Sequence, residues 1–199
     1  MTKKLNIALI GCGGWGKNIA RNLHQIGALA CIYDSDQNLS KKLNQDFKLH
    51  DYTINDIFKN ENIQALVIAS SAKTHRDIAE EALKNNKDVL IEKPFCLSLN
   101  DAITLSKLAI KKNKVLMAGH LLNYHNAFIK MQDLIREGKI GETKNIRAQR
   151  LALGAIRSHE SVIYDLAVHD VSMILAIMQE LPVKINAHSI HHNTNIGPD

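Results

Sequence analysis

The chain has 199 residues, 45% hydrophobic and 23% charged, and its 25 basic and 20 acidic side chains give a net charge of +5. This is an ordinary globular composition, and the length allows one complete domain and part of a second. The apolar runs are too short to cross a bilayer, and the scattered basic residues lack interleaved aromatic side chains. We therefore expect neither a membrane protein nor a nucleic-acid-binding protein.

The cysteines and the N-terminal residues bear on the cellular compartment. Cys12, Cys31 and Cys96 are odd in number and widely spaced, which favours reduced thiols over a disulfide framework. The residues before the first strand-like run contain no apolar segment long enough for a signal peptide. Both observations predict a cytoplasmic protein.

The first predicted elements are a strand over Leu5–Ile10 and a helix that starts soon after it. The strand is almost continuously apolar, as is typical of a parallel strand covered on both faces. A G-x-G-x-x-G sequence joins the two elements and indicates a dinucleotide-binding loop. Its first glycine permits a tight turn, its second lets the backbone approach a pyrophosphate, and its third lets helix and strand pack closely. The predicted cofactor-binding residues here are Gly11, Gly13, Gly14, Trp15 and Gly16.

Asp34 follows the second predicted strand, Ala28–Tyr33. A carboxylate at this position can accept hydrogen bonds from both ribose hydroxyls of NAD, and it would repel the additional phosphate of NADP. We therefore predict NAD as the cofactor in preference to NADP. Trp15, the sole tryptophan, is predicted to pack near the nicotinamide or to cover the start of the helix. Cys12 is interpreted as a small residue in a tight loop and not as a nucleophile.

Ser70, Ser71 and His75 come after the third predicted strand, Ile63–Ala69. Small hydroxyl side chains at such a strand end can lie along a dinucleotide and cap the helix that follows. His75 either contacts the cofactor or is a surface residue in the first turn of that helix. We include all three among the candidate cofactor-binding residues.

The next predicted strand, Val89–Ile91, ends in Glu92-Lys93-Pro94. Proline stops the strand, so Lys93 would lie at the carboxyl end of the sheet, where open α/β sheets bind ligands. A surface Glu-Lys pair before a turn is the alternative interpretation. The strand predicted over Val115–Ala118 extends an alternation of strands and helices that indicates a doubly wound parallel sheet. We assign residues 1–120 to this Rossmann domain.

The pattern changes in residues 121–199, which we interpret as the start of an α+β domain that binds substrate. A helix is predicted over Tyr124–Glu137, and a second, apolar helix ends near Met178. Strands are predicted over Thr143–Leu153 and Val183–His188. The predicted fold class is therefore α/β, with a Rossmann domain followed by an incomplete second domain.

Asp165 and His169 are four residues apart in the last predicted helix, so they share one face. A carboxylate can hold a neighbouring histidine in one orientation and tautomer. Such a histidine could take a proton from a hydroxyl group while hydride leaves the same carbon. Lys93 could hydrogen-bond the same oxygen and stabilise its developing negative charge. A solvated pair near a helix start is the alternative interpretation.

Three histidines near the end of the sequence, His188, His191 and His192, could suggest a metal site. No nearby thiolate or carboxylate in the sequence completes a ligand set. We therefore predict no bound metal.

With these motifs in place, the sequence resembles the Gfo/Idh/MocA family of NAD(P)-dependent sugar and cyclitol oxidoreductases. The resemblance covers the whole chain and rests on Gly11–Gly16, Asp34, Glu92-Lys93-Pro94 and the pair Asp165 and His169. Two further segments, Gly119–His125 and Arg150–Arg157, are similar to the branch that contains 3-dehydrogenases of UDP-N-acetylglucosamine and of its uronic acid.

The resemblance implies oxidation of a secondary hydroxyl of a sugar or UDP-sugar, at C3 of the hexose. It implies that His169 is the base, Lys93 the electrostatic partner and Asp165 the orienting acid. The implied substrate-binding residues are Lys93, Tyr124, Arg150, Arg157, Asp165 and His169, and Glu92 and Lys93 are expected to contact the cofactor as well. Full-length relatives are expected to be homo-oligomers, because family members commonly associate through a broad sheet of which this chain includes about two strands.

Two alternatives stay open. The chain is either a dehydrogenase or a truncated remnant that at most binds NAD without catalysis. Within the family, a free sugar or an inositol is the alternative to a UDP-sugar as substrate.

Overall fold

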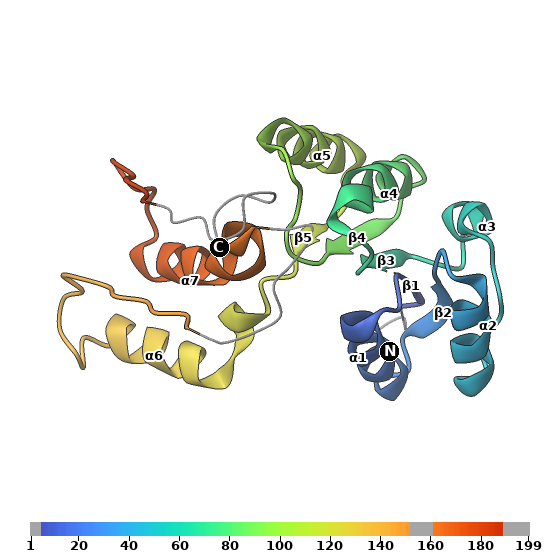
Figure 1. Ribbon diagram of the computed structural model, residues 1–199, viewed down its shortest axis with the longest axis horizontal. Coiled ribbons are helices and arrows are strands. Elements are labelled where there is room, and N and C mark those ends of the chain that lie inside the picture. The colour runs from blue at the N-terminus through green and yellow to red at the C-terminus, as the bar shows by residue number, and fades with distance from the viewer. Residues whose placement is uncertain (1–4, 152–160, 189–199) are drawn as a thin grey trace. The chain divides into compact units, whose positions relative to one another are not determined.

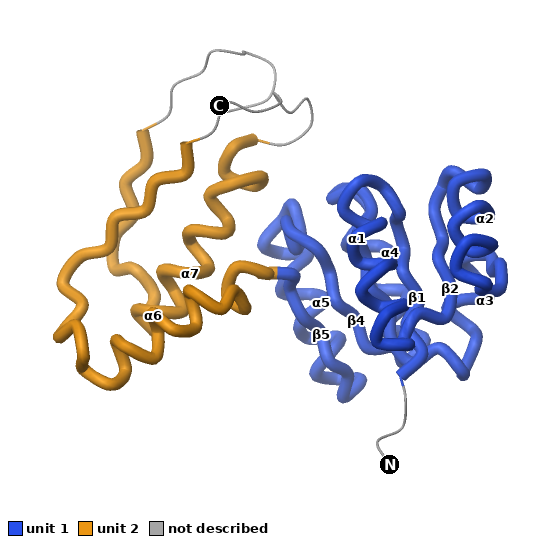
Figure 2. The backbone as a smooth tube through the Cα atoms, turned by 90° about the horizontal axis from the view of Figure 1, so that it is seen from below, with its two compact units in different colours: residues 1–119 blue, residues 120–199 orange. Residues whose placement is uncertain are grey.

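The computed structural model describes residues 5–151 and 161–188. The chain divides into two compact units, residues 1–119 and residues 120–199 (Figure 2). Unit 1 contains β1 (Ile7–Ile10), α1 (Gly14–Gln25), β2 (Leu29–Tyr33), α2 (Gln37–Asp46), α3 (Ile54–Lys59), β3 (Ala65–Ile68), α4 (Ala72–Lys84), β4 (Asp88–Ile91), α5 (Leu99–Lys112) and β5 (Leu116–Ala118) (Figure 1). Unit 2 contains the 3₁₀-helix η1 (Leu121–Tyr124), the α-helix α6 (Asn126–Arg136), the π-helix η2 (Ile163–Ala167) and the α-helix α7 (Val168–Met178). Within the described ranges, no helix has the length and apolar character needed to cross a membrane.

Unit 1 is built on a five-stranded parallel sheet in the order β2-β1-β3-β4-β5. β1 pairs with both β2 and β3, so the chain first adds a strand on one side of β1 and then continues on the other side. The loops that follow β1 and β3 therefore diverge at this switch point, where open α/β sheets bind ligands. The doubly wound parallel sheet predicted from the sequence is confirmed.

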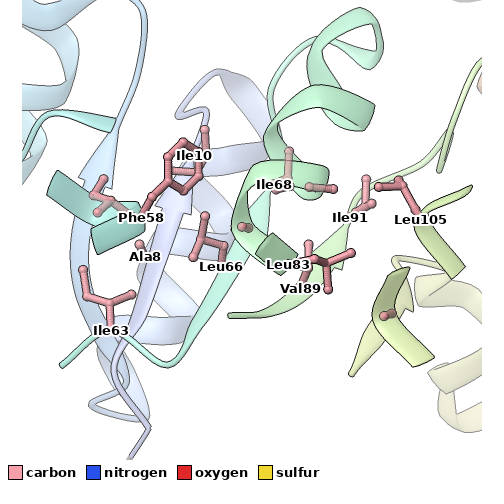
Figure 3. Close-up of a cluster of buried hydrophobic side chains, with 14 of the residues drawn as sticks. Ala8, Ile10, Phe58, Ile63, Leu66, Ile68, Leu83, Val89, Ile91 and Leu105 are labelled. Atoms are coloured by element: carbon pink, nitrogen blue, oxygen red, sulfur yellow. The ribbon is translucent and has the colours of Figure 1, made fainter. Parts of the chain in front are cut away.

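Hydrophobic side chains of the sheet fill two clusters, because successive residues of a strand point to opposite faces. Ala8 and Ile10 of β1 belong to one cluster, whereas Leu9 between them belongs to the other. In the first cluster, Leu83 of α4 and Leu105 of α5 are fully buried (Figure 3). Burying each side chain of this size contributes about 1.5–3 kcal/mol, so the core holds the helices firmly against the sheet.

A side chain covers part of the exposed edge of β2. The amide of Asn44 in α2 accepts a hydrogen bond from the backbone nitrogen of Ile32 at 2.9 Å and donates to the carbonyl oxygen of Ile32 at 2.8 Å. Asn44 is 1% exposed and also donates to Asp51 at 2.7 Å. Asn44 thus occupies the backbone groups that a neighbouring strand would otherwise pair with, which protects this edge from association.

In unit 2, the amide nitrogen of Gln132 in α6 donates to the carbonyl oxygen of Ala176 in α7 at 3.3 Å. α6 begins two residues later than the sequence analysis predicted. His125 precedes it as the N-cap, and its Nδ1 accepts a hydrogen bond from the backbone nitrogen of Ala127 at 3.2 Å. This bond satisfies one of the N–H groups that a helix start leaves without an intrahelical partner.

The strands predicted over Thr143–Leu153 and Val183–His188 are not found in their described parts, residues 143–151 and 183–188. The side chain of Val183 is fully exposed, and Leu151 is 85% exposed. A strand requires backbone hydrogen bonds to a neighbour, which a pattern of side chains does not supply. The two strand predictions are therefore wrong for these residues.

Candidate cofactor and active site

The loop between β1 and α1 leaves no room for a side chain at its first and last glycine. Gly11 has a φ of +94°, and a Cβ there would lie 2.5 Å from the backbone nitrogen of Ser70. A Cβ at Gly16 would collide with the carbonyl oxygen of Gly11. Glycine at these two positions lets the loop contact both the neighbouring strand end and its own helix.

Gly13 and Gly14 have a different environment, because a Cβ at either would meet no atom within 4 Å. Packing within the chain therefore does not require glycine here, whereas close approach of a ligand would. Gly13 is also the N-cap of α1, and no side chain caps this helix start. The first-turn N–H groups of α1 are thus available to an anion such as a pyrophosphate. The open space and the uncapped helix fit a dinucleotide.

Both carboxylate oxygens of Asp34 accept backbone hydrogen bonds, one of them from the glycine loop. Its Oδ2 accepts a hydrogen bond from the backbone nitrogen of Cys12 at 2.7 Å, and its Oδ1 accepts one from the backbone nitrogen of Asp36 at 3.0 Å. Burial alone would raise the pKa of Asp34, but the hydrogen bonds, led by that from Cys12, hold it below its ordinary value. The carboxylate is therefore ionised at neutral pH, as a group that binds ribose hydroxyls must be.

Cys12 is fully buried beside this carboxylate. Burial, followed by the hydrogen bond from its Sγ to Asp34, raises the pKa of the thiol to about 12. The reactive thiolate is thus nearly absent at neutral pH. This agrees with the interpretation of Cys12 as a small residue in a tight loop.

Glu92 connects the end of β4 to the start of α1. Its Oε1 accepts a hydrogen bond from the indole nitrogen of Trp15 at 2.9 Å, and its Oε2 accepts one from the backbone nitrogen of Lys93 at 3.3 Å. Gly119 packs closely against Glu92, since a Cβ there would lie 3.1 Å from the Glu92 carboxyl carbon. A hydrogen bond therefore links Trp15, which is 49% exposed, to the residue that precedes Lys93.

His75 is 1% exposed, so its interpretation as a surface residue is wrong. Its Nδ1 lies 2.9 Å from the carbonyl oxygen of Pro94, and its Nε2 lies 3.0 Å from the carbonyl oxygen of Ser70. The hydroxyl group of Ser70 is 2.8 Å from that of Thr74. Ser71 is the N-cap of α4, but its side chain makes no capping hydrogen bond. It is exposed at the end of β3.

The predicted residues of unit 1 therefore gather at one edge of the sheet. The glycine loop follows β1, Asp34 follows β2, Ser70 follows β3, and Lys93 follows β4. The carboxyl ends of parallel strands meet at the same edge, and the hydrogen bonds of Asp34, Glu92 and His75 join these loops to one another. Lys93 is half-buried there. The sequence motifs thus converge on one site within unit 1.

In unit 2, Asp165 and His169 lie on either side of a change in helix type. Asp165 belongs to η2, a π-helical turn, and His169 is the second residue of α7. π-helical turns are rare and are frequently found at functional sites. His169 is 9% exposed, so its side chain is largely enclosed within this unit.

Arg150 and Asp170 form a bidentate ion pair that the sequence analysis did not predict. The Arg150 Nε is 2.8 Å from the Asp170 Oδ2, and its Nη2 is 2.9 Å from the Oδ1. The hydrogen bonds from Arg150 hold the pKa of Asp170 below its ordinary value, and the pair raises the pKa of Arg150. The sequence places Asp170 next to His169, but it does not indicate that Arg150, 20 residues earlier, is the partner of Asp170. The ion pair links Arg150 to the first turn of α7.

Two other residues implied as substrate-binding also belong to this unit's sequence. Tyr124 ends η1 and is 64% exposed, so its side chain is accessible to a ligand. Arg157 lies outside the described residues.

A hollow of about 570 Å³ lies within unit 2, between α6, α7 and the segment 140–149. Its lining is mainly apolar and includes Phe128, Met131, Ile135, Met173 and Ile177. Polar residues, among them Asn145, Arg147, Gln149 and Asp170, also line it. In residues 5–151 and 161–188, no group of three histidine, cysteine or acidic side chains could hold a metal ion. His191 and His192 lie outside these ranges.

The family model described as "Oxidoreductase family, NAD-binding Rossmann fold" matches residues 5–120, which is more than half of the chain. This chain belongs to the Gfo/Idh/MocA oxidoreductase family. The matched residues include the glycine loop, Asp34 and Glu92-Lys93-Pro94. The resemblance inferred from the motifs is confirmed.

Curated relatives of this Gfo/Idh/MocA chain have different reactions in their names. It is 28% identical over 184 residues to UDP-N-acetylglucosamine 3-dehydrogenase of Acidithiobacillus ferrooxidans, a match that covers 92% of this chain and 57% of that protein. It is 27% identical over 150 residues to 2,7-anhydro-N-acetylneuraminate hydratase of Escherichia coli, covering 73% and 40%. It is 26% identical over 187 residues to myo-inositol 2-dehydrogenase of Thermotoga maritima, covering 88% and 55%. The chain therefore spans about half the length of these relatives.

The fold agrees with a solved structure of the Acidithiobacillus ferrooxidans UDP-N-acetylglucosamine 3-dehydrogenase. The match has a TM-score of 0.86 at 27% identity and covers 97% of this chain and 62% of that one. A probable dehydrogenase from Thermotoga maritima matches with a TM-score of 0.77 at 24% identity, covering 89% and 56%. Both likenesses extend well beyond residues 5–120, so they include part of unit 2.

Proposed function

We propose that this chain carries the cofactor site and the catalytic residues of an NAD-dependent dehydrogenase that oxidises a secondary hydroxyl of a sugar, with a UDP-sugar as the substrate. The observation that best supports this proposal is that Lys93 follows β4 at the same sheet edge as the glycine loop. The residue before it, Glu92, accepts a hydrogen bond from Trp15 of α1. The similarity to UDP-N-acetylglucosamine 3-dehydrogenase over 92% of the chain supports the substrate class.

The cofactor would be held by the residues of unit 1. The first-turn N–H groups of α1, next to Gly13 and Gly14, would bind the pyrophosphate. The Asp34 carboxylate would accept the ribose hydroxyls, and its negative charge would repel the additional phosphate of NADP. Bound NAD supplies the acceptor for the hydride that leaves the substrate carbon. We expect NADH to bind more tightly than NADPH, and tighter binding of NADPH would contradict the role of Asp34.

The reacting hydroxyl group would lose its proton to His169, with Asp165 orienting the imidazole. The ammonium group of Lys93 would donate a hydrogen bond to the same oxygen as negative charge develops on it. The hydroxyl group loses its proton to His169, and the carbon that bears this group loses a hydride. The two losses together convert the alcohol into a ketone. These roles divide the work, since unit 1 binds the cofactor and unit 2 supplies the base.

Substitution of Lys93 tests the proposal directly. Lys93→Ala should lower turnover at least 100-fold, because it removes the charge that stabilises the oxygen, while NADH affinity changes little. Lys107→Ala is the matched control, since Lys107 is exposed on α5 away from the loops. An equal loss of turnover and NADH affinity in Lys93→Ala would contradict a catalytic role.

Two alternatives have specific support. The similarity to myo-inositol 2-dehydrogenase over 88% of the chain favours an inositol or a free sugar as the second candidate substrate. A panel of sugars with and without the UDP group separates this candidate from the first, because only a UDP-sugar enzyme should require the nucleotide. The other alternative is a chain that binds NAD without catalysis, which is compatible with the match of residues 5–120 to an NAD-binding family model. Saturable NADH binding without turnover on any member of the panel would favour that alternative.

A further inference from the structure

The buried histidine of α4 makes an unusual pair of contacts. Both ring nitrogens of His75 face backbone carbonyl oxygens, that of Pro94 at 2.9 Å and that of Ser70 at 3.0 Å. The side chain is 1% exposed, so water has almost no access to it. The two carbonyl groups belong to different loops, one after β3 and one after β4.

A carbonyl oxygen accepts hydrogen bonds but cannot donate one. A ring nitrogen that carries a proton donates to the carbonyl oxygen that it faces. Because the ring is rigid, a hydrogen bond at one nitrogen also fixes the position of the other nitrogen beside its own carbonyl oxygen. The imidazole therefore connects the two loops.

The two acceptors flank the proposed active site. Pro94 follows Lys93 directly, and Glu92 on the other side of Lys93 accepts the hydrogen bond from Trp15. Ser70 packs against the glycine loop, because its backbone nitrogen lies where a side chain of Gly11 would project. A continuous series of contacts therefore runs from α1 through the loop after β4 to His75, and from there back to the glycine loop.

We propose that His75 is a positioning residue that lies between the two carbonyl groups and fixes the loop of Lys93 relative to the glycine loop. It does not have to touch the cofactor to do so. The consequence for catalysis rests on the proposed function of Lys93, whereas the link between the loops does not. The inference also explains why a histidine is buried at a sheet edge that otherwise binds ligands.

The contacts of the ring can be observed without turnover. In the ¹⁵N-labelled chain, two-bond ¹H–¹⁵N spectra report the hydrogen-bonding state of each imidazole nitrogen, and the His75→Gln spectrum assigns the His75 signals. We expect the His75 nitrogens to be shielded from exchange with water. Ring signals that exchange as rapidly as those of the exposed histidines would overturn the proposal.

The link between the loops can be followed through Trp15, because the chain has one tryptophan and therefore one indole N–H signal. His75→Phe removes both ring nitrogens and should shift this signal, since Glu92 would move with the loop. Asn44→Ala is the matched control, because it also removes buried hydrogen bonds but at β2, on the far side of β1 from His75. An unshifted indole signal in folded His75→Phe would overturn the link. If this variant does not fold, His75→Gln, which keeps one donor, serves in the same experiment and should give a smaller shift.

The catalytic consequence is a separate measurement. His75→Gln should lower kcat at least tenfold and change NADH affinity less than threefold, because it displaces Lys93 while leaving the glycine loop in place. Equal losses in kcat and NADH affinity would overturn the positioning role. If the unsubstituted chain shows no turnover, the proposed function fails, and the ring and indole spectra still decide the role of His75.

Discussion

The two units differ in how far they bury their own apolar residues. Unit 1 buries two clusters of side chains, in which Leu9, Leu83 and Leu105 are fully buried. Among described residues 120–151 and 161–188, Phe128 and His169 are the sole buried side chains. Apolar residues in these ranges, such as Leu181 and Val183, are largely exposed.

This difference separates the proposed cofactor site from the proposed base. The proposed cofactor residues lie on loops between elements that a complete hydrophobic core holds in place, whereas the proposed base lies in a unit with little core of its own. A site on rigid elements keeps its geometry, and a sparsely packed region opens at low cost in free energy. We therefore expect the cofactor site to tolerate changes in unit 2, and the four predictions below test this from the largest expected effect to the smallest.

His169→Asn should lower turnover about 10²- to 10⁴-fold, because it removes the proposed general base. NADH affinity should stay unchanged, since the cofactor residues lie in unit 1. Steady-state kinetics and an NADH titration measure the two quantities, with His188→Asn as the control at an exposed histidine. A loss of NADH affinity matching the loss of turnover would show that the division between the units is wrong.

Core substitutions should affect the two units unequally. Leu83→Ala in unit 1 should lower the free energy of unfolding by about 2–5 kcal/mol, because it leaves a cavity in a fully packed cluster. Val171→Ala in α7 should change it by less than about 0.5 kcal/mol, because that side chain is 53% exposed. Urea denaturation followed by circular dichroism gives both values. Similar losses in the two variants would contradict the contrast in packing.

Two glycine substitutions should separate packing from ligand binding within unit 1. Gly16→Ala should weaken NADH binding at least tenfold and lower Tm, because its Cβ collides with the carbonyl oxygen of Gly11. Gly13→Ala should weaken NADH binding with little change in Tm, since its Cβ meets no protein atom within 4 Å. Thermal denaturation and NADH titration give the four values. Unchanged NADH binding in Gly13→Ala would argue against a pyrophosphate at this loop.

The smallest effect concerns the Arg150–Asp170 pair. The folded pKa of Asp170 is lowered, so its contribution to stability is present above the ordinary carboxyl pKa of 3.8 and is lost as pH falls through the folded pKa. Asp170→Asn should therefore cost at most about 1 kcal/mol at pH 7, because the pair is partly exposed, and the difference from the unsubstituted chain should shrink in acid. Urea denaturation at several pH values measures this. A difference that grows on acidification would contradict the assigned sign.

The parallel sheet and the cofactor loop could be predicted because their causes are local in the sequence. A continuous apolar run forms a strand that is buried on both faces, and G-x-G-x-x-G carries its steric requirements within six residues. The same holds for Lys93, since the proline after it ends the strand at the sheet edge. In each case neighbouring residues contain the physical reason.

Features that depend on contacts between residues far apart in the sequence could not be predicted from local patterns. His75 was assigned to the cofactor or to the surface, and its buried contacts with Ser70 and Pro94 exist because the fold brings two loops together. The predicted strand over Thr143–Leu153 failed in its described part for the same reason, since a strand depends on a partner. The sequence by itself determined the sheet, its order of elements and the residue types at its carboxyl edge. The tertiary structure decided which of those side chains bond to one another, because hydrogen bonds between distant segments depend on chain packing and not on local pattern.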